Sequence, residues 1–588
     1  MLSLSRKSLP PDNAEPSTSR RISQSIRRAL SVGRLGSSRR RLRKQIEADR
    51  VNSIALVTRL PPEILAHIFL LCVPNSWCKD LDWPLVTTRI IRRWREVALG
   101  CPELWANIVF RRKLLPVMLS RAKAIPLIIH ANLDDPHFDP KFVRANIERV
   151  GSMECQGSTT ALEEFFLDYP AGRVSYTGLR NLSVLHHALD QRPVWLEAML
   201  FHASERTRRS RPPRRLRLAK CAFPWNSPWY LNLTDLHLSD LHKAQGPTMT
   251  VLFSVLVASP LLQDLFLDNT HVRRDGWQSS PSTELPHLRT IYLGETAGTC
   301  SQILENLSFP SIMTVSVNGV AEGYLTQSKY ISRIVGHHDY TQAKYQLLRI
   351  ELPSEVHSPC LRVTANSSQN DNSLCIEIYQ TSESRPQSLG SEALTSFFDP
   401  LDCKRYLNIT ALHLVHLSLG AEQWKIVFHC RNIATLHLHD SDPLQLFRLL
   451  LDRAMRCIGF TKGADIEDRD ARGHCKQLLP RLHLIALQGV DCGGQVEVPL
   501  IPFTSVLRSL LWARRIGRCP IANLRLEDCR NLFRQDLAHF NFFASVSWDG
   551  VGESQEEKED GGDDIRSYSL NIYELLPISP FVLQPSVG

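Results

Sequence analysis

The stretch Leu233-Thr234-Asp235-Leu236-His237-Leu238 contains a spacing of apolar residues that recurs along most of the chain. Its last two apolar positions alternate with polar residues, which is typical of a strand with one buried face. With isoleucine or valine allowed, the spacing occurs in eight trios: Leu233-Leu236-Leu238, Leu262-Leu265-Leu267, Leu288-Ile291-Leu293, Ile312-Val315-Val317, Ile409-Leu412-Leu414, Ile433-Leu436-Leu438, Leu482-Ile485-Leu487 and Ile521-Leu524-Leu526. The sequence therefore predicts a series of equivalent short strands.

The first four trios lie 24 to 29 residues apart, measured between their central residues. Later gaps of 97 and 49 residues are close to multiples of 24, which indicates degenerate repeats within them. A period of about 20–29 residues with this pattern is typical of leucine-rich repeats, which must stack because one repeat cannot bury its apolar edge alone. We expect return helices at residues 249–262 and 424–430, and an irregular leucine-rich-repeat-like α/β solenoid over residues 231–547.

The side chains between the buried positions are predicted to lie on the opposite face of the strands. They combine aromatic, histidine and polar character, which suits a protein-binding surface, although ordinary solvated surface is the alternative for each. The full set is Asp235, His237, Asp264, Phe266, Thr290, Tyr292, Thr314, Ser316, His413, Thr435, His437, His439, Asn523, Arg525 and Glu527. As target-binding candidates we select His237, Phe266, Tyr292, His413, His437 and Arg525.

His413 and His437 are 24 residues apart, so we expect them on adjacent strands within reach of a shared metal ion. No carboxylate or cysteine occurs at a matching spacing, and two imidazoles alone do not complete a zinc site. No metal site is predicted.

Residues 60–72, Leu-Pro-Pro-Glu-Ile-Leu-Ala-His-Ile-Phe-Leu-Leu-Cys, predict a short apolar helix. The two prolines suit its first turn, and Glu63 places a negative charge near the positive helix end. A second helix is expected at residues 85–99, with Trp94 inward, and a short third turn begins at Pro102 and carries Trp105. Such a small unit buries little core, so its apolar surface indicates an interface; the alternative is the first hairpin of a larger domain.

The order of these features resembles the F-box of a large fungal F-box family. The likeness rests on the Leu-Pro-Pro-Glu-Ile-Leu opening, the Arg-Arg-Trp-Arg-Glu-Val-Ala middle and the Pro-Glu-Leu-Trp close, within residues 57–110. It departs from the family pattern in the polar spacer at residues 75–83 and at residues 88–91, where the family tends to have a small or cysteine-containing stretch. The resemblance implies a helical F-box that docks onto a Skp-type adaptor, and through it a cullin, with contacts from Leu60, Pro61, Ile64, Leu65, Ile68, Val86, Trp94 and Trp105.

The net charge of +9 lies in residues 1–50, which contain 13 Lys/Arg and 4 Asp/Glu, so the rest of the chain is neutral. Residues 1–56 are predicted to be a basic, mostly disordered tail, and residues 548–588 an acidic loop and C-terminal tail. Between the F-box and the repeats, residues 111–230 are expected to form a linker and entry segment. It contains a helix at 111–124, a buried strand at 126–131 and an exposed basic linker at 206–217. Residues 354–387 are expected to be a loop-heavy insertion.

Fifteen cysteines without a Cys-x-x-Cys pair favour reduced thiols over a disulfide framework or a structural zinc. No stretch is long and apolar enough for a membrane span, and no secretory segment follows the N-terminus. We therefore expect the cytoplasm and/or the nucleus, and no membrane partner. A mitochondrial transit peptide is the alternative for the Arg- and Ser-rich start of the chain.

No nucleotide-binding, nucleophile-elbow or zinc-protease motif occurs in the sequence, so neither an enzyme nor a cofactor is expected. The leading hypothesis is the substrate-recognition subunit of an SCF-type (Skp–cullin–F-box) ubiquitin ligase, with an unidentified target protein on the repeat face. The alternative is a non-enzymatic F-box scaffold or interaction protein that acts without substrate ubiquitination. A nucleic-acid partner is not expected, because the body of the chain is neutral.

Overall fold

The computed structural model describes residues 60–72, 92–108, 110, 114–167, 178–187, 193–196, 213–275, 282–311, 313–321, 333–334, 345–352, 361–367, 373–380, 409–458, 478–492 and 503–551. The predicted basic tail, Val86 and the acidic segment after residue 551 lie outside this part of the chain. The chain divides into two compact units. Unit 1 runs to residue 131 with two short later segments, and unit 2 contains most of the remainder.

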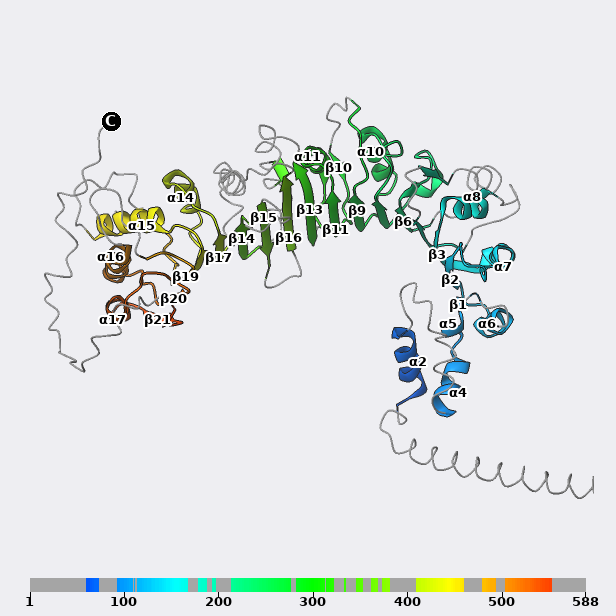
Figure 1. Ribbon diagram of the computed structural model, residues 1–588, viewed down its shortest axis with the longest axis horizontal. Coiled ribbons are helices and arrows are strands. Elements are labelled where there is room, and N and C mark those ends of the chain that lie inside the picture. The colour runs from blue at the N-terminus through cyan, green and yellow to red at the C-terminus, as the bar shows by residue number, and fades with distance from the viewer. Residues whose placement is uncertain are drawn as a thin grey trace, which may run out of the picture. The chain divides into compact units, whose positions relative to one another are not determined.

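The described part of unit 1 contains short helices and short strands (Figure 1). Its elements are α2 (Pro62–Leu71), α4 (Arg92–Gly100), α5 (Pro102–Trp105), β1 (Asn107–Ile108), α6 (Leu115–Ala122) and β2 (Leu127–Asn132). Pro61 is the N-cap of α2 and Pro62 its first residue, as predicted from the missing proline N–H. The strand predicted at residues 126–131 is confirmed as β2, which pairs with β1 in parallel.

The core of unit 1 is built around Trp105. Its ring is buried, its indole N–H donates to the Ala98 carbonyl at 2.7 Å, and the Arg121 guanidinium lies 4.3 Å from the ring centre. Phe69 of α2 packs edge-on against Trp94 of α4, with 5.3 Å between ring centres. These contacts join α2, α4, α5 and α6 into one small core.

Unit 2 is dominated by one long, mostly parallel sheet, whose strands lie side by side (Figure 1). In spatial order they are β3 (Val150–Gly157), β4 (Asn181–His186), β6 (Arg215–Ala219), β8 (Asp235–Ser239), β9 (Asp264–Asp268), β11 (Thr290–Gly294), β13 (Thr314–Ala321), β16 (Ser373–Gln380), β15 (Leu361–Asn366), β14 (Leu347–Glu351), β17 (Ala411–Val415), β18 (Thr435–His439), β19 (Leu484–Gln488), β20 (Asn523–Glu527) and β21 (Ser545–Trp548). The chain is therefore of the α/β class, as predicted.

Helices connect many of these strands and lie on one side of the sheet (Figure 1). They are α7 (Pro140–Asn146), α8 (Thr159–Leu167), α10 (Met249–Val257), α11 (Ala297–Glu305), α14 (Ala421–Val427), α15 (Leu444–Cys457), α16 (Phe503–Ile516) and α17 (Arg534–Asn541). The helices predicted at residues 249–262 and 424–430 correspond to α10 and α14. Helices α14 to α17 pack against one another in chain order.

The predicted trios form the core of unit 2. In each trio whose first residue is described, that residue lies two positions before the start of a strand, and the other two trio residues lie on the buried face of the strand. Every described trio residue is at most 2% exposed; Ile312 lies outside the described residues. Burial of these positions fixes which face of each strand is left for other contacts.

A residue in the left-handed backbone conformation follows several of the strands, at the turn where the chain leaves the sheet. Asp240, Asn269, Asp440 and Asp528 have φ between 46° and 52°, a conformation that Asn and Asp tolerate better than most residues. The Asp240 N–H donates to Asp268 O and the Asn269 N–H to Gly294 O. The turn residue of one strand is thereby tied to the end of the next strand.

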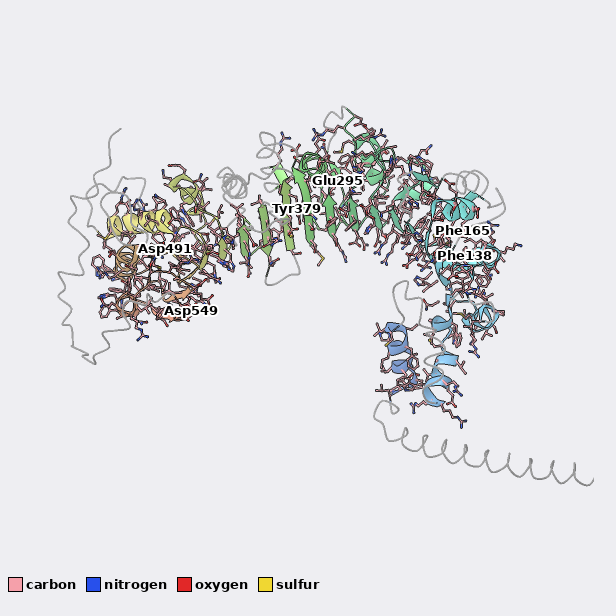
Figure 2. The ribbon with its side chains drawn as sticks, in the orientation of Figure 1. Phe138, Phe165, Glu295, Tyr379, Asp491 and Asp549 are labelled. Atoms are coloured by element: carbon pink, nitrogen blue, oxygen red, sulfur yellow. The ribbon has the colours of Figure 1, made fainter. Side chains whose placement is uncertain are left out.

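The buried Glu295 adds a side-chain link at the same level (Figure 2). It follows β11, and its carboxylate accepts hydrogen bonds from the backbone N–H and the hydroxyl of Thr270, which follows β9. Burial raises the pKa of Glu295, against the lowering effect of these donors. The carboxylate thus connects two neighbouring turns of the sheet.

Four sequence-based expectations about unit 2 are wrong or incomplete. The 49-residue gap adds no strand between β18 and β19 in the sheet, because these two strands pair directly with each other. The predicted insertion at residues 354–387 contains β15 and β16, whose alternation was hidden by their Ser-rich flanks. The predicted basic linker at 206–217 ends within β6, where Leu216 and Leu218 are buried between arginines. The sheet strands of unit 2 also begin before residue 231, with β3 and β4.

The described part of the 97-residue gap contains three strands in reversed spatial order. β16 pairs in parallel with β13, β14 pairs in parallel with β17, and β15 lies antiparallel between them. Spacing along the chain shows how many residues separate two trios, but not the order in which the strands between them pair.

Arg514 of α16 is buried, and its guanidinium is held by backbone carbonyls. Its guanidinium donates to the carbonyls of Leu478 at 2.9 Å, Leu479 at 2.9 Å and Cys519 at 3.1 Å. Burial lowers its pKa to about 10, so it is cationic at neutral pH. The side chain closes the turn that leads into β19.

We expect Arg514→Leu to lower the free energy of unfolding by about 3 kcal/mol, because buried carbonyls lose their donors. Urea denaturation followed by circular dichroism measures this change. Arg508→Leu, a half-buried position on the same helix, is the matched control, with an expected loss below about 1 kcal/mol. Equal losses in the two variants would contradict this role of Arg514.

Candidate protein-binding surfaces

Helix α2 exposes apolar side chains on one face. Ile64 is 48%, Ile68 36% and Leu71 73% exposed, and the spacing i, i+4, i+7 places them along one side of the helix. Leu65 and Phe69 are buried on its other side. We call Ile64, Ile68 and Leu71 the α2 apolar face, which the helical pattern predicted as part of a broader stripe.

The predicted adaptor-binding residues fall into two groups in unit 1. Pro61, Ile64 and Ile68 are exposed, and Leu60 and Trp94 are half-buried. Leu65 and Trp105, in contrast, are at most 1% exposed and pack inside unit 1. A broad helical stripe contains both a core side and a surface side, and sequence alone did not separate them. Contact of Leu65 and Trp105 with an adaptor stays a prediction.

On the sheet of unit 2, the parallel register aligns the middle outward residues of successive strands. His237 of β8 pairs with Phe266 of β9, and Phe266 pairs with Tyr292 of β11. Further along, His413 of β17 pairs with His437 of β18. Because equivalent residues are direct neighbours, side chains from segments far apart in sequence contact each other.

His237, Phe266 and Tyr292 form a continuous stack, which we call the aromatic ladder. The ring centres of His237 and Phe266 are 3.8 Å apart at 17°, and those of Phe266 and Tyr292 are 4.2 Å apart at 7°. The Asn318 amide donates to the Tyr292 hydroxyl oxygen at 3.3 Å. Burial, and secondarily Arg217, lowers the pKa of His237 to about 4, so this ring is neutral at physiological pH. The ladder is an uncharged aromatic surface across three strands.

His413 and His437 form a second pair of contacting rings, with ring centres 4.0 Å apart and ring planes tilted by 31°. Burial lowers the pKa of His413 to about 4, with His437 and Arg349 as further causes, and also lowers the pKa of His437. Arg525 is separate from the ladder and from this pair: it lies two strands beyond His437 and pairs with Glu527 on its own strand. Of the six target-binding candidates, three therefore meet in the ladder and two in the histidine pair.

Four strands lie between the aromatic ladder and the histidine pair, and three of them, β14, β15 and β16, carry a charged network that sequence reasoning missed. Arg362 Nε lies 2.7 Å from Glu377 and its Nη1 3.5 Å from Glu351, which also meets Arg349 at 3.2 Å. The Tyr379 hydroxyl, labelled in Figure 2, donates to Glu377 at 3.2 Å. The alternation of polar and apolar residues in Arg349-Ile350-Glu351 and Glu377-Ile378-Tyr379 could have identified these outward side chains from the sequence. The surface between the ladder and the histidine pair is thus polar and internally paired.

Within the described ranges, no group of three His, Cys, Asp or Glu residues is placed to hold a metal ion. Among the helices in that part of the chain, none has the length and apolarity needed to cross a bilayer. No family model matches this sequence, and no curated protein matches it. Any functional assignment therefore depends on the residues of the two surfaces themselves.

The low pKa of His413 predicts a pH-dependent contribution to stability. The unfolded state binds a proton near pH 6.5, whereas the folded state binds it only near pH 4. The free energy of unfolding therefore falls as the pH decreases from about 6.5 towards about 4, because the unfolded chain takes up the proton first.

We expect His413→Gln to flatten this pH dependence, measured as urea midpoints at pH 7, 6 and 5. His287→Gln, at an exposed histidine outside the pair, is the control and should keep the pH profile of the unmodified chain. A profile that is the same in His413→Gln and the unmodified chain would contradict the role given to burial of the His413 ring.

Proposed function

We propose that this chain is the substrate-recognition subunit of an SCF-type ubiquitin ligase. Residues 57–110 resemble an F-box, and the α2 apolar face within them is the observation that carries the proposal. Three large aliphatic side chains on one exposed helix face are costly in water and favour a protein partner. A Skp-type adaptor would cover this face, with a cullin bound through the adaptor, in the cytoplasm and/or nucleus.

We also propose that unit 2 is an irregular leucine-rich-repeat-like solenoid that binds the target protein. Support comes from the repeated trios, from one parallel strand for each trio in constant register, and from return helices on a single side of the sheet. The ladder and the histidine pair consist of half-buried aromatic side chains on the sheet face opposite the buried trio residues. Aromatic residues commonly anchor protein interfaces.

In this proposal the chain contributes positioning rather than chemistry. Holding a target beside a ubiquitin-charged enzyme raises the effective concentration of the target lysines. Bond formation then takes place on other subunits of the complex.

The double variant Ile64→Asp plus Ile68→Asp should weaken binding of a Skp-type adaptor at least about thirtyfold, because two carboxylates would enter an apolar contact. Biolayer interferometry with the purified full-length chain and adaptor gives the dissociation constant. Val117→Asp, at an exposed apolar position of α6 in the same unit, is the matched control and should bind as the unmodified chain does. Unaltered adaptor affinity in the double variant would exclude the α2 apolar face as the docking site.

Affinity purification of the tagged chain from its host, followed by mass spectrometry, separates receptor from scaffold. The receptor proposal requires adaptor, cullin and at least one protein whose ubiquitination falls when the double variant replaces the unmodified chain. Recovery of adaptor and cullin without any such protein would favour the non-enzymatic scaffold.

A further inference from the structure

Strand β9 presents Asp264, Phe266 and Asp268 in succession on the open face of the sheet. The two carboxylates therefore lie on either side of the central ring of the aromatic ladder. Within the described part of the chain, neither Asp264 nor Asp268 forms an ion pair with a lysine or arginine. Burial and the neighbouring Asp240 raise the pKa of Asp268, which is consistent with uncompensated negative charge at this point.

Two arginines of β6, a strand that lies two strands from β9, are engaged or remote. Arg215 of β6 pairs with Asp235 at 3.2 Å. Arg217 is aligned with His237, and so lies two strands, or roughly 10 Å, from Phe266, a distance comparable with the Debye length in physiological salt. The surface around Phe266 is thus both apolar and acidic.

We propose that the Asp264–Phe266–Asp268 surface binds an extended basic segment of the target protein, with arginine as the preferred anchor. This proposal rests on the proposed function only in taking the segment from a target. Both faces of the Phe266 ring are covered by His237 and Tyr292, so an incoming side chain meets ring edges and carboxylates. The aliphatic stem of arginine can lie across the ring edges while its guanidinium pairs with a carboxylate in two parallel hydrogen bonds.

The spacing of the two carboxylates defines the preferred sequence. Asp264 and Asp268 are four residues apart on one strand, which corresponds to about 13 Å. An extended segment that runs along β9 therefore matches both with two arginines that are also four residues apart. Lysine keeps the charge but lacks the planar guanidinium, and is expected to bind more weakly.

The probe is a fluorescein-labelled peptide Ser-Arg-Ser-Ala-Ser-Arg-Ser, titrated with the full-length chain and followed by fluorescence anisotropy. We expect saturable binding that weakens with added salt, weaker binding of the lysine analogue, and no binding of the glutamate analogue. The double variant Asp264→Asn plus Asp268→Asn should weaken binding roughly tenfold, and Phe266→Ala should weaken it as well. Glu164→Gln, at an exposed carboxylate of α8, is the matched control and should leave binding unchanged.

Three outcomes would overturn the proposal. The first is binding of the glutamate analogue as tight as that of the arginine peptide. The second is the same peptide affinity in the Asp264→Asn plus Asp268→Asn variant as in the unmodified chain. The third is a roughly tenfold gain in peptide affinity when the basic residues at positions 39–44 are replaced by glutamine. The last result would assign this surface to the basic segment of the chain itself rather than to a target. Circular dichroism of each variant verifies folding.

Adaptor binding is measured separately, through the α2 apolar face, and should be unaffected in the Asp264→Asn plus Asp268→Asn variant. Loss of peptide binding with intact adaptor binding, or the reverse, therefore distinguishes failure of this inference from failure of the ligase proposal.

Discussion

The surface of unit 2 depends on one constraint: equivalent residues of neighbouring parallel strands pair directly with each other. Each trio buries its apolar residues against the helices, and the left-handed residue after several strands links the strand end to the next strand at the same level. A shift by one residue would turn buried leucines outward and outward side chains inward, so the register is strongly specified. The stacking of His237, Phe266 and Tyr292 follows from this registration, because residues at equivalent positions become direct neighbours.

The same constraint explains which features could be predicted from sequence. Period-two alternation identified the outward face of β8, β9 and β11, and equal spacing within the trios placed His237, Phe266 and Tyr292 at equivalent positions. Sequence could not predict that Arg525 would stand apart from the histidine pair, because the intervening strand β19 carries Ala486 at the equivalent position. Arginines that flank Leu216 and Leu218 hid β6 as well, since charge was given more weight than alternation.

In unit 1 the helical pattern predicted α2 and its first turn, but not the division of its apolar stripe. A stripe that includes Ile64, Leu65, Ile68 and Phe69 covers more than one side of a helix. Contacts with Trp94 and with the rest of the small core bury Phe69 and Leu65, and leave the isoleucines exposed. That division depends on partners contributed by α4 and α5, which periodicity within a single helix does not describe. The same small core holds the backbone of α2 in place, and with it the exposed side chains of the α2 apolar face.

The reversed order of β14, β15 and β16 has a consequence for the assembly of unit 2. In a regular repeat array each strand adds to the edge left by the strand before it, so the sheet can grow in the direction of synthesis. Here the free edge of β13 is completed only by β16, and β14 reaches the sheet through β15 and through β17. A nascent chain that ends after β14 therefore leaves one edge of β13 unpaired, which is an opportunity for wrong strand pairing. The middle of unit 2 is therefore closed by non-local pairings, β13 with β16 and β14 with β17, and contacts of this kind slow folding.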